Sequence, residues 1–137
     1  MKFTLQEASP GNVIVSCSAN RVVVRERGPG SEPGSESVNE RVLERSAILT
    51  PELVVTEWPP RDCVSLTVEH IRAVLALRPE LILLGTGECQ QFPDARVAHA
   101  VLAAGVGFDA MDTRAACRTY NVLTQEGRRV AAALLIP

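Results

Sequence analysis

The sequence has few aromatic residues, little net charge and no long apolar run. Aromatic residues make up 4% of the 137 residues and apolar residues 46%, so the core must be built mainly from Val, Leu, Ile and Ala. The net charge is −2, with acidic residues and arginines interleaved, which leaves no electrostatic footprint for nucleic acid or an anionic membrane. No apolar run reaches the roughly 18 residues of a membrane span, and no secretory signal pattern opens the chain. We expect no nucleic-acid partner, no membrane insertion and a cytoplasmic location.

Residues that commonly carry chemistry are also scarce. The four cysteines stand singly, at Cys17, Cys63, Cys89 and Cys117. Without a C-x-x-C pair they argue against a zinc site, and a disulfide framework is unusual in a cytosolic chain of this size. The two histidines, His70 and His99, fall in expected helices, and neither is placed as a base beside a nucleophilic cysteine. We therefore expect no catalytic residue, no metal site and no cofactor.

The first half of the chain favours antiparallel β structure within one domain, 1–137. Apolar and β-branched runs predict four short strands, at 13–17, 21–25, 46–50 and 53–56. Asn20, which tolerates left-handed backbone angles, joins the first two strands into a hairpin. The segment 27–40 is rich in Gly, Pro, Ser and Glu and predicts a mobile polar loop. Trp58, the only tryptophan, is interpreted as a core or lid residue rather than as a binding residue.

Thr67 can cap a helix. From this residue onward, helical and strand patterns alternate. The predicted helices cover 68–77, 94–104 and 113–125, and the predicted strands cover 81–84, 106–111 and 130–136. This order implies parallel strands joined by right-handed crossovers. The predicted fold class is therefore α/β: a single domain with a central mixed β-sheet, helices packed on it and an additional N-terminal antiparallel β layer.

A glycine-rich motif follows the strand 81–84, where ligands bind in open α/β sheets. Its residues are Gly85, Thr86, Gly87 and Glu88. The two glycines could turn backbone N–H groups toward an anion, or they could simply allow a tight exit from the strand. Gln90 stands where a G-x-G-x-x-G motif would have its third glycine, and no P-loop lysine follows. Both interpretations stay open.

The helix 113–125, with Asp112 as its N-cap, is the second candidate for a site. Helical periodicity places a polar set away from the core: Arg114, Cys117, Arg118 and Asn121. Two arginines four positions apart repel, and the first opposes the positive end of the helix dipole. Their partner is either Glu88 or Asp112 in an ordinary ion pair, or a bound anion. The thiol of Cys117 beside them is predicted to have a lowered pKa.

Taken in order, six motifs carry a resemblance to a known family. They are LLGTGE (83–88), QFP (91–93), MDT (111–113), ACRTYNVL (116–123), EGRRV (126–130) and AAAL (131–134). The chain resembles the domain-of-unknown-function family of small α/β proteins that includes the mitochondrial NADH:ubiquinone oxidoreductase complex assembly factor 3. The resemblance implies a compact α/β fold with a central mixed sheet and no established enzyme activity. It also implies a protein partner, because the mitochondrial member acts by binding other proteins.

Two functions follow as hypotheses. The first is a non-enzymatic protein-interaction domain, similar to an assembly factor, with a protein partner of unknown identity. The alternative is a binder or enzyme for a small anionic ligand in a crevice between the glycine motif and the helix 113–125. That crevice would be formed by Gly85, Thr86, Gly87, Glu88, Asp112, Arg114, Cys117, Arg118 and Asn121.

Overall fold

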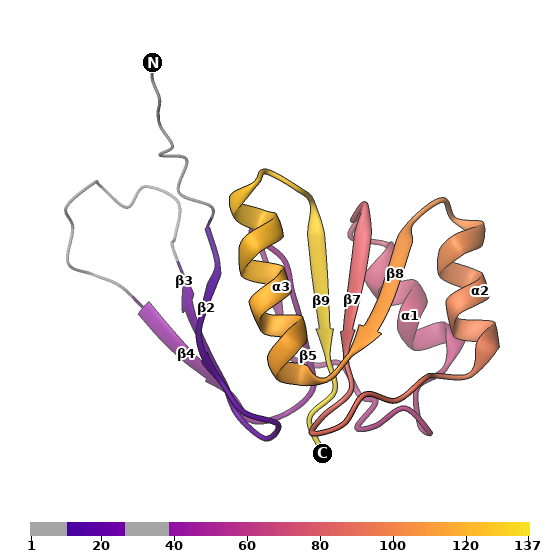
Figure 1. Cartoon of the computed structure of the whole chain (residues 1–137), viewed down its shortest axis with the longest axis horizontal. Coiled ribbons are helices and arrows are strands. Elements are labelled where there is room, and N and C mark those ends of the chain that lie inside the picture. The colour runs from indigo at the N-terminus through magenta and orange to yellow at the C-terminus, as the bar shows by residue number, and fades with distance from the viewer. Residues whose placement is uncertain (1–10, 27–38) are drawn as a thin grey trace.

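The computed structural model describes residues 11–26 and 39–137. Within them the chain forms one five-stranded sheet, one three-stranded sheet and three helices (Figure 1). The elements in chain order are β2 (Val13–Cys17), β3 (Val22–Glu26), β4 (Asn39–Leu43), β5 (Ala47–Leu49), β6 (Val54–Val55), α1 (Val68–Leu75), β7 (Leu81–Gly85), α2 (Ala95–Ala103), β8 (Gly107–Met111), α3 (Thr113–Gln125) and β9 (Val130–Leu134).

The five-stranded sheet is mixed and has the order β6-β5-β9-β7-β8. Strand β7 pairs in parallel with both β8 and β9, as the alternation of strands and helices predicts. Strand β5 pairs antiparallel with β9 and with β6, so the first half of the chain extends the parallel core. The predicted α/β class and the central mixed sheet are confirmed.

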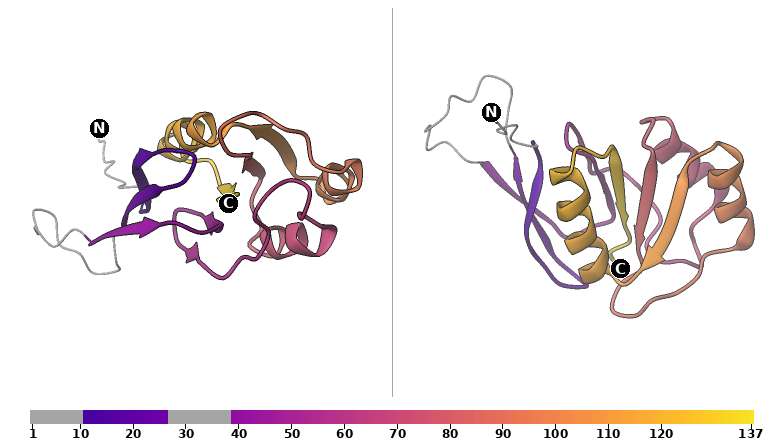
Figure 2. Two further views of the ribbon diagram at one scale, coloured as in Figure 1. Left: turned by 90° about the horizontal axis from the view of Figure 1, so that it is seen from below. Right: turned by 45° about the horizontal axis from the view of Figure 1, so that its top comes forward.

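Alternate residues of β9 serve two separate cores. Val130, Ala132 and Leu134 pack toward α3, whereas Ala131 and Ala133 pack toward α1 and α2. This follows from the strand geometry, in which successive side chains point to opposite faces. Figure 2 shows α3 and α1 on opposite sides of the sheet. Small alanines in the central strand let helices approach both faces closely.

The three-stranded sheet is the predicted N-terminal antiparallel layer. Its order is β2-β3-β4, with all pairs antiparallel, and the predicted hairpin of β2 and β3 is confirmed. One face of this sheet packs on α3, with Val22 and Val24 beside Tyr120 in the same core. Helix α3 therefore lies between two sheets and is buried on two sides.

The structure corrects the predicted loop at 27–40. Asn39 and Glu40 belong to β4, a strand that the sequence did not suggest because four of its five residues are exposed. Pairing with β3 over its whole length determines this strand, with Val42 opposite Val23 and Leu43 opposite Val22. The remainder of the predicted loop, 27–38, lies outside the described residues.

The predicted helices agree with the structure to within a few residues. Helix α3 has the predicted bounds, and α1 ends at Leu75 rather than at 77. The last turn of α1 tightens, because the N–H groups of Leu77 and Arg78 bond to carbonyls three residues back. No helix in 11–26 or 39–137 is long and apolar enough to span a bilayer.

Trp58 and His70 both have structural roles. Trp58 is 4% exposed, and its Nε1 donates to the carbonyl of His70 at 3.0 Å, which confirms it as a core residue. The Nδ1 of His70 accepts from the backbone N–H of Thr67 at 3.0 Å, and Thr67 Oγ1 accepts from the His70 N–H at 3.3 Å. This reciprocal capping box starts α1 and confirms Thr67 as its cap.

Candidate functional site

The glycine motif begins at the end of β7, in the connection to α2, and is hydrogen-bonded to the start of α3. Gly87 has a φ of +97°, a conformation that side chains rarely adopt. A Cβ on Gly85 would lie 3.0 Å from the side chain of Leu134 and 3.2 Å from Thr113 Oγ1. Both glycines are therefore required by the backbone and its close neighbours, which accounts for the motif without a ligand.

The N–H groups of this loop donate to protein atoms. Gly87 N donates to Thr113 Oγ1 at 2.8 Å, and its carbonyl accepts from the Thr113 N–H at 2.9 Å. Thr86 N donates to the Met111 carbonyl at 2.9 Å, and Thr86 Oγ1 donates to the carbonyl of Cys89 at 2.6 Å. An anion nest would need such N–H groups free, so the geometry favours the tight strand exit.

A pocket of about 270 Å³ lies between β2 and α3. It is lined by Ile14, Val15, Ser16, Cys17, Arg114, Cys117, Arg118 and Asn121. Four of the nine predicted crevice residues thus share one pocket, those on α3, and the glycine motif and Asp112 do not line it. The contribution of β2 was missed, because only the packing of the hairpin against α3 brings it there and no local motif marks it.

The two arginines have no carboxylate partner within the described ranges. The side chains of Arg114 and Arg118 are exposed, and neither takes part in an ion pair there. Asp112 instead caps α3, with Oδ1 accepting from the Ala115 N–H at 3.0 Å. Glu88, the other expected partner, is exposed. The pocket is therefore bordered by two cations that the described carboxylates do not neutralise.

Two predictions for Cys117, its place on a solvated helix face and its lowered pKa, are wrong. Its side chain is 2% exposed and belongs to the core beneath β2, not to a solvated helix face. A hydrogen bond with the Cys17 thiol, followed by burial, raises the pKa of Cys117. Helical periodicity correctly placed Cys117 beside the arginines. It could not show that the hairpin of β2 and β3 covers this side of α3 and buries the thiol.

The thiol with the lowered pKa is Cys17 instead. The hydrogen bond with Cys117 lowers the pKa of Cys17 most, the guanidinium groups of Arg114 and Arg118 act in the same direction, and burial and Asp112 oppose them. Cys17 is half-buried at the end of β2, and its Sγ lies 3.7 Å from the Thr113 carbonyl.

Asn121 also differs from its predicted place on a solvated face. Its Nδ2 donates to the Ile14 carbonyl at 2.8 Å, and its Oδ1 accepts from the Ile14 N–H at 3.0 Å. The amide thus pairs with the outer edge of β2 as a neighbouring strand would. Its polar atoms are used in holding the hairpin against α3.

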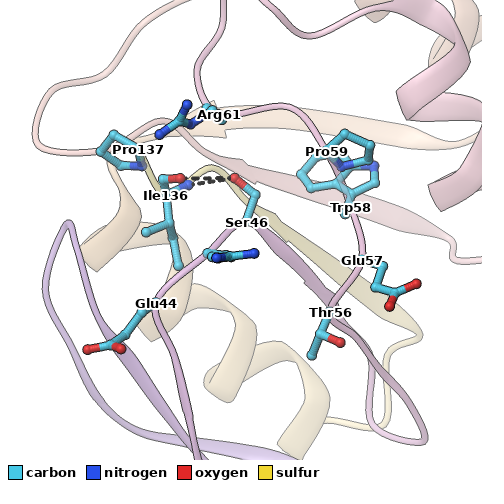
Figure 3. A pocket seen from close by; sticks show the side chains of 10 residues that line it. Glu44, Ser46, Thr56, Glu57, Trp58, Pro59, Arg61, Ile136 and Pro137 are labelled. Carbon is cyan, nitrogen blue, oxygen red and sulfur yellow. Dashed lines mark hydrogen bonds between the residues drawn. The ribbon is translucent and has the colours of Figure 1, made fainter.

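A larger pocket of about 620 Å³ was not predicted (Figure 3). It is lined by Glu44, Arg45, Ser46, Thr56, Glu57, Trp58, Pro59, Arg61, Ile136 and Pro137. Ser46 Oγ accepts from the Ile136 N–H at 2.8 Å, and the carboxylates of Glu44 and Glu57 point away from this pair in Figure 3. The charges of this pocket are of both signs, which favours no single class of ligand.

No group of three or more His, Cys, Asp or Glu side chains that could hold a metal ion occurs in the described part of the chain. The chemistry available is therefore that of one half-buried thiol, one buried thiol and two guanidinium groups around the smaller pocket.

Comparison with known proteins agrees with this fold. An NMR structure of a Xanthomonas campestris protein superposes with a TM-score of 0.74 at 40% identity, covering 98% of this chain and 92% of that one. NADH dehydrogenase [ubiquinone] 1 alpha subcomplex assembly factor 3 of Danio rerio is 30% identical over 96% of this chain and 68% of its own length. A Francisella tularensis protein named 13 kDa major membrane protein is 38% identical over 54% of this chain.

The chain spans 60% of the Francisella protein and about half of the mammalian assembly factors, 49% in mouse and 53% in human. The model of the family described as protein of unknown function (DUF498/DUF598) matches residues 30–135. That match covers the whole five-stranded sheet and all three helices, and β4 of the three-stranded sheet. The resemblance inferred from the motifs is thus confirmed: this chain belongs to the DUF498/DUF598 family of proteins of unknown function.

Proposed function

We propose that this protein is a non-enzymatic protein-interaction domain whose role is related to that of an assembly factor. The observation that supports it is an apolar surface on the three-stranded sheet, which we name the outer valine face and define as Val15, Val23 and Val42. Val23 pairs with Val42 on one side and with Ser16 on the other, and Val15 lies at the irregularity of β2 between Ile14 and Ser16. Val15 and Val42 are 43% and 44% exposed.

Strand geometry turns this face away from α3. Val22 and Val24 are fully buried against the helix, so the side chain of Val23 between them points to the opposite side. The exposed side chains of Val15 and Val42, with Val23 at 8% exposure on the same strand layer, suit contact with an apolar protein surface. The Danio rerio relative carries the name of an assembly factor, and a protein partner is the matching expectation for this chain.

The test compares what three immobilised forms capture from a lysate of the source organism. They are the parent, Val42→Glu on the outer valine face, and Val122→Glu, a control on α3 where the side chain is 54% exposed. We expect one defined protein to be retained by the parent and the control and lost by Val42→Glu, because a buried unpaired carboxylate is strongly unfavourable. Equal capture of that protein by all three forms would contradict the proposed surface.

The second candidate function is binding of a small anionic ligand in the pocket between β2 and α3. Arg114 and Arg118 border this pocket without a carboxylate partner in the described ranges, and this favours an external anion. Native mass spectrometry of the untagged protein tests it. We expect a bound anionic species that leaves on denaturation and is absent from Arg118→Gln, whereas a clean mass for the parent argues against the ligand.

The proposal includes a cytoplasmic location. Cell fractionation checks it, and recovery of the protein in the membrane fraction, as the name of the Francisella relative would suggest, would contradict it.

A further inference from the structure

Two of the four cysteines meet across the contact between the hairpin and α3. Cys17 is the last residue of β2, and Cys117 lies one helical turn beyond the start of α3. Both line the pocket between β2 and α3, and Cys17 packs against the buried cluster that contains Cys117. The Cys17 sulfur also lies 3.7 Å from the carbonyl of Thr113, the residue one turn before Cys117. The other two thiols lie elsewhere, Cys63 in the core on the opposite side of the sheet and Cys89 exposed on a loop.

The two thiols differ in access. Cys17 is half-buried and lines the pocket, whereas Cys117 is 2% exposed beneath it. An incoming molecule therefore reaches Cys17 first, and Cys117 can only act on what Cys17 holds. The thiolate is the reactive form of cysteine, and the guanidinium groups of Arg114 and Arg118 favour it at Cys17.

We propose that Cys17 and Cys117 form a dithiol that is converted reversibly to a disulfide by exchange with low-molecular-weight disulfides that bear carboxylates. Arg114 and Arg118 select the anionic reactant. This inference concerns the pocket between β2 and α3, which shares Val15 with the outer valine face, and its chemistry does not depend on the protein-interaction proposal.

The exchange balances in two steps. The Cys17 thiolate attacks one sulfur of the incoming disulfide, a Cys17–sulfur bond forms, and the other half leaves as a thiolate. Cys117 then loses its proton to the departing thiolate and attacks Cys17 Sγ, which expels the second half. The protein dithiol is oxidised by two electrons, and the small disulfide is reduced to two thiols. Because Cys17 and Cys117 line the same pocket, the second step is intramolecular.

The experiment uses the full chain carrying Cys89→Ser, which removes the exposed thiol, and oxidised glutathione as the probe. Intact mass and peptide mapping should show a species lighter by two hydrogen atoms, with Cys17 joined to Cys117. Cys117→Ala should accumulate one glutathione adduct on Cys17, and Cys17→Ser should form neither the adduct nor the bridge. Because the bridge is measured in the parent itself, the result does not depend on whether the variants fold.

Charge selection is tested in the same background with cystamine, a cationic disulfide. The double variant Arg114→Gln/Arg118→Gln should react with oxidised glutathione about tenfold more slowly than the parent at low salt, and should react with cystamine no more slowly than the parent.

A disulfide between Cys17 and Cys117 that forms only after unfolding in urea, or does not form at all, overturns the proposal. A bridge that forms at rates unaffected by the double variant overturns the anionic selection and leaves a neutral dithiol exchange in its place.

Discussion

Arg114 and Arg118 lie one helical turn apart at the mouth of the pocket, and their charges are not balanced by a described carboxylate. Cations four apart on a helix repel each other by a few tenths of a kcal/mol. Asp112, the nearest acid in sequence, uses its Oδ1 to cap the helix. At the scale of single residues, this arrangement favours binding or reactivity over stability.

Replacing Arg118 by Ala should therefore cost little stability. The variant loses no ion pair of the described residues and relieves the repulsion from Arg114, so its free energy of unfolding should stay within about 0.5 kcal/mol of the parent value. Urea unfolding of the variant and the parent measures this difference in the free energy of unfolding. A loss of several kcal/mol would reveal a buried ion-pair role for this arginine.

Tyr120 should make the protein sensitive to alkali. The side chain is fully buried, its hydroxyl donates to the Asn12 carbonyl at 3.0 Å, and burial raises its pKa. The unfolded chain then releases a proton from this group at a lower pH than the folded chain does. Stability from this residue is complete below about pH 10 and falls as the pH rises above it.

Urea midpoints of the parent and Tyr120→Phe at neutral pH and above about pH 10 check this expectation. Tyr120→Phe should be less stable at neutral pH, because the Asn12 carbonyl loses its partner, and should lose less additional stability in alkali. Equal losses in alkali for both proteins would contradict the assignment.

At the scale of elements, α3 holds the molecule together because it is covered by a sheet on each side. Asn121 links it to the edge of β2 through two hydrogen bonds of 2.8 and 3.0 Å. Periodicity predicted the bounds of α3. It could not predict that a second sheet buries Cys117 and engages Asn121, because a helix pattern records polarity and not what covers a polar residue.

Replacing Asn121 by Ala should loosen the hairpin. The backbone N–H and carbonyl of Ile14 would lose their partners, at a cost of about 1 to 3 kcal/mol in the free energy of unfolding. The neighbouring variant Val122→Ala, at an exposed position, is the matched control and should change stability by less than about 0.5 kcal/mol. Equal urea midpoints for Asn121→Ala and the parent would mean that these bonds contribute nothing to the fold.

At the scale of the whole molecule, the sequence predicted the α/β class and the parallel strands, because long periodic segments alternate from Thr67 onward. It missed β4, whose four exposed residues carry no apolar pattern, and the part of the pocket formed by β2. Both depend on pairing and packing between distant segments. The outer valine face is a feature of the same kind, since Val15 on β2 and Val42 on β4 belong to one sheet only because both strands pair with β3.

The central claim, that this face binds a protein, is tested most directly by hydrogen exchange of the protein alone and in complex with the captured partner. The account predicts slower amide exchange in Asn39–Leu43 and Val13–Cys17, the two edge strands of the three-stranded sheet, and unchanged exchange in α1 and α2. Protection confined to α1 and α2, with β2 and β4 unaffected, would contradict it.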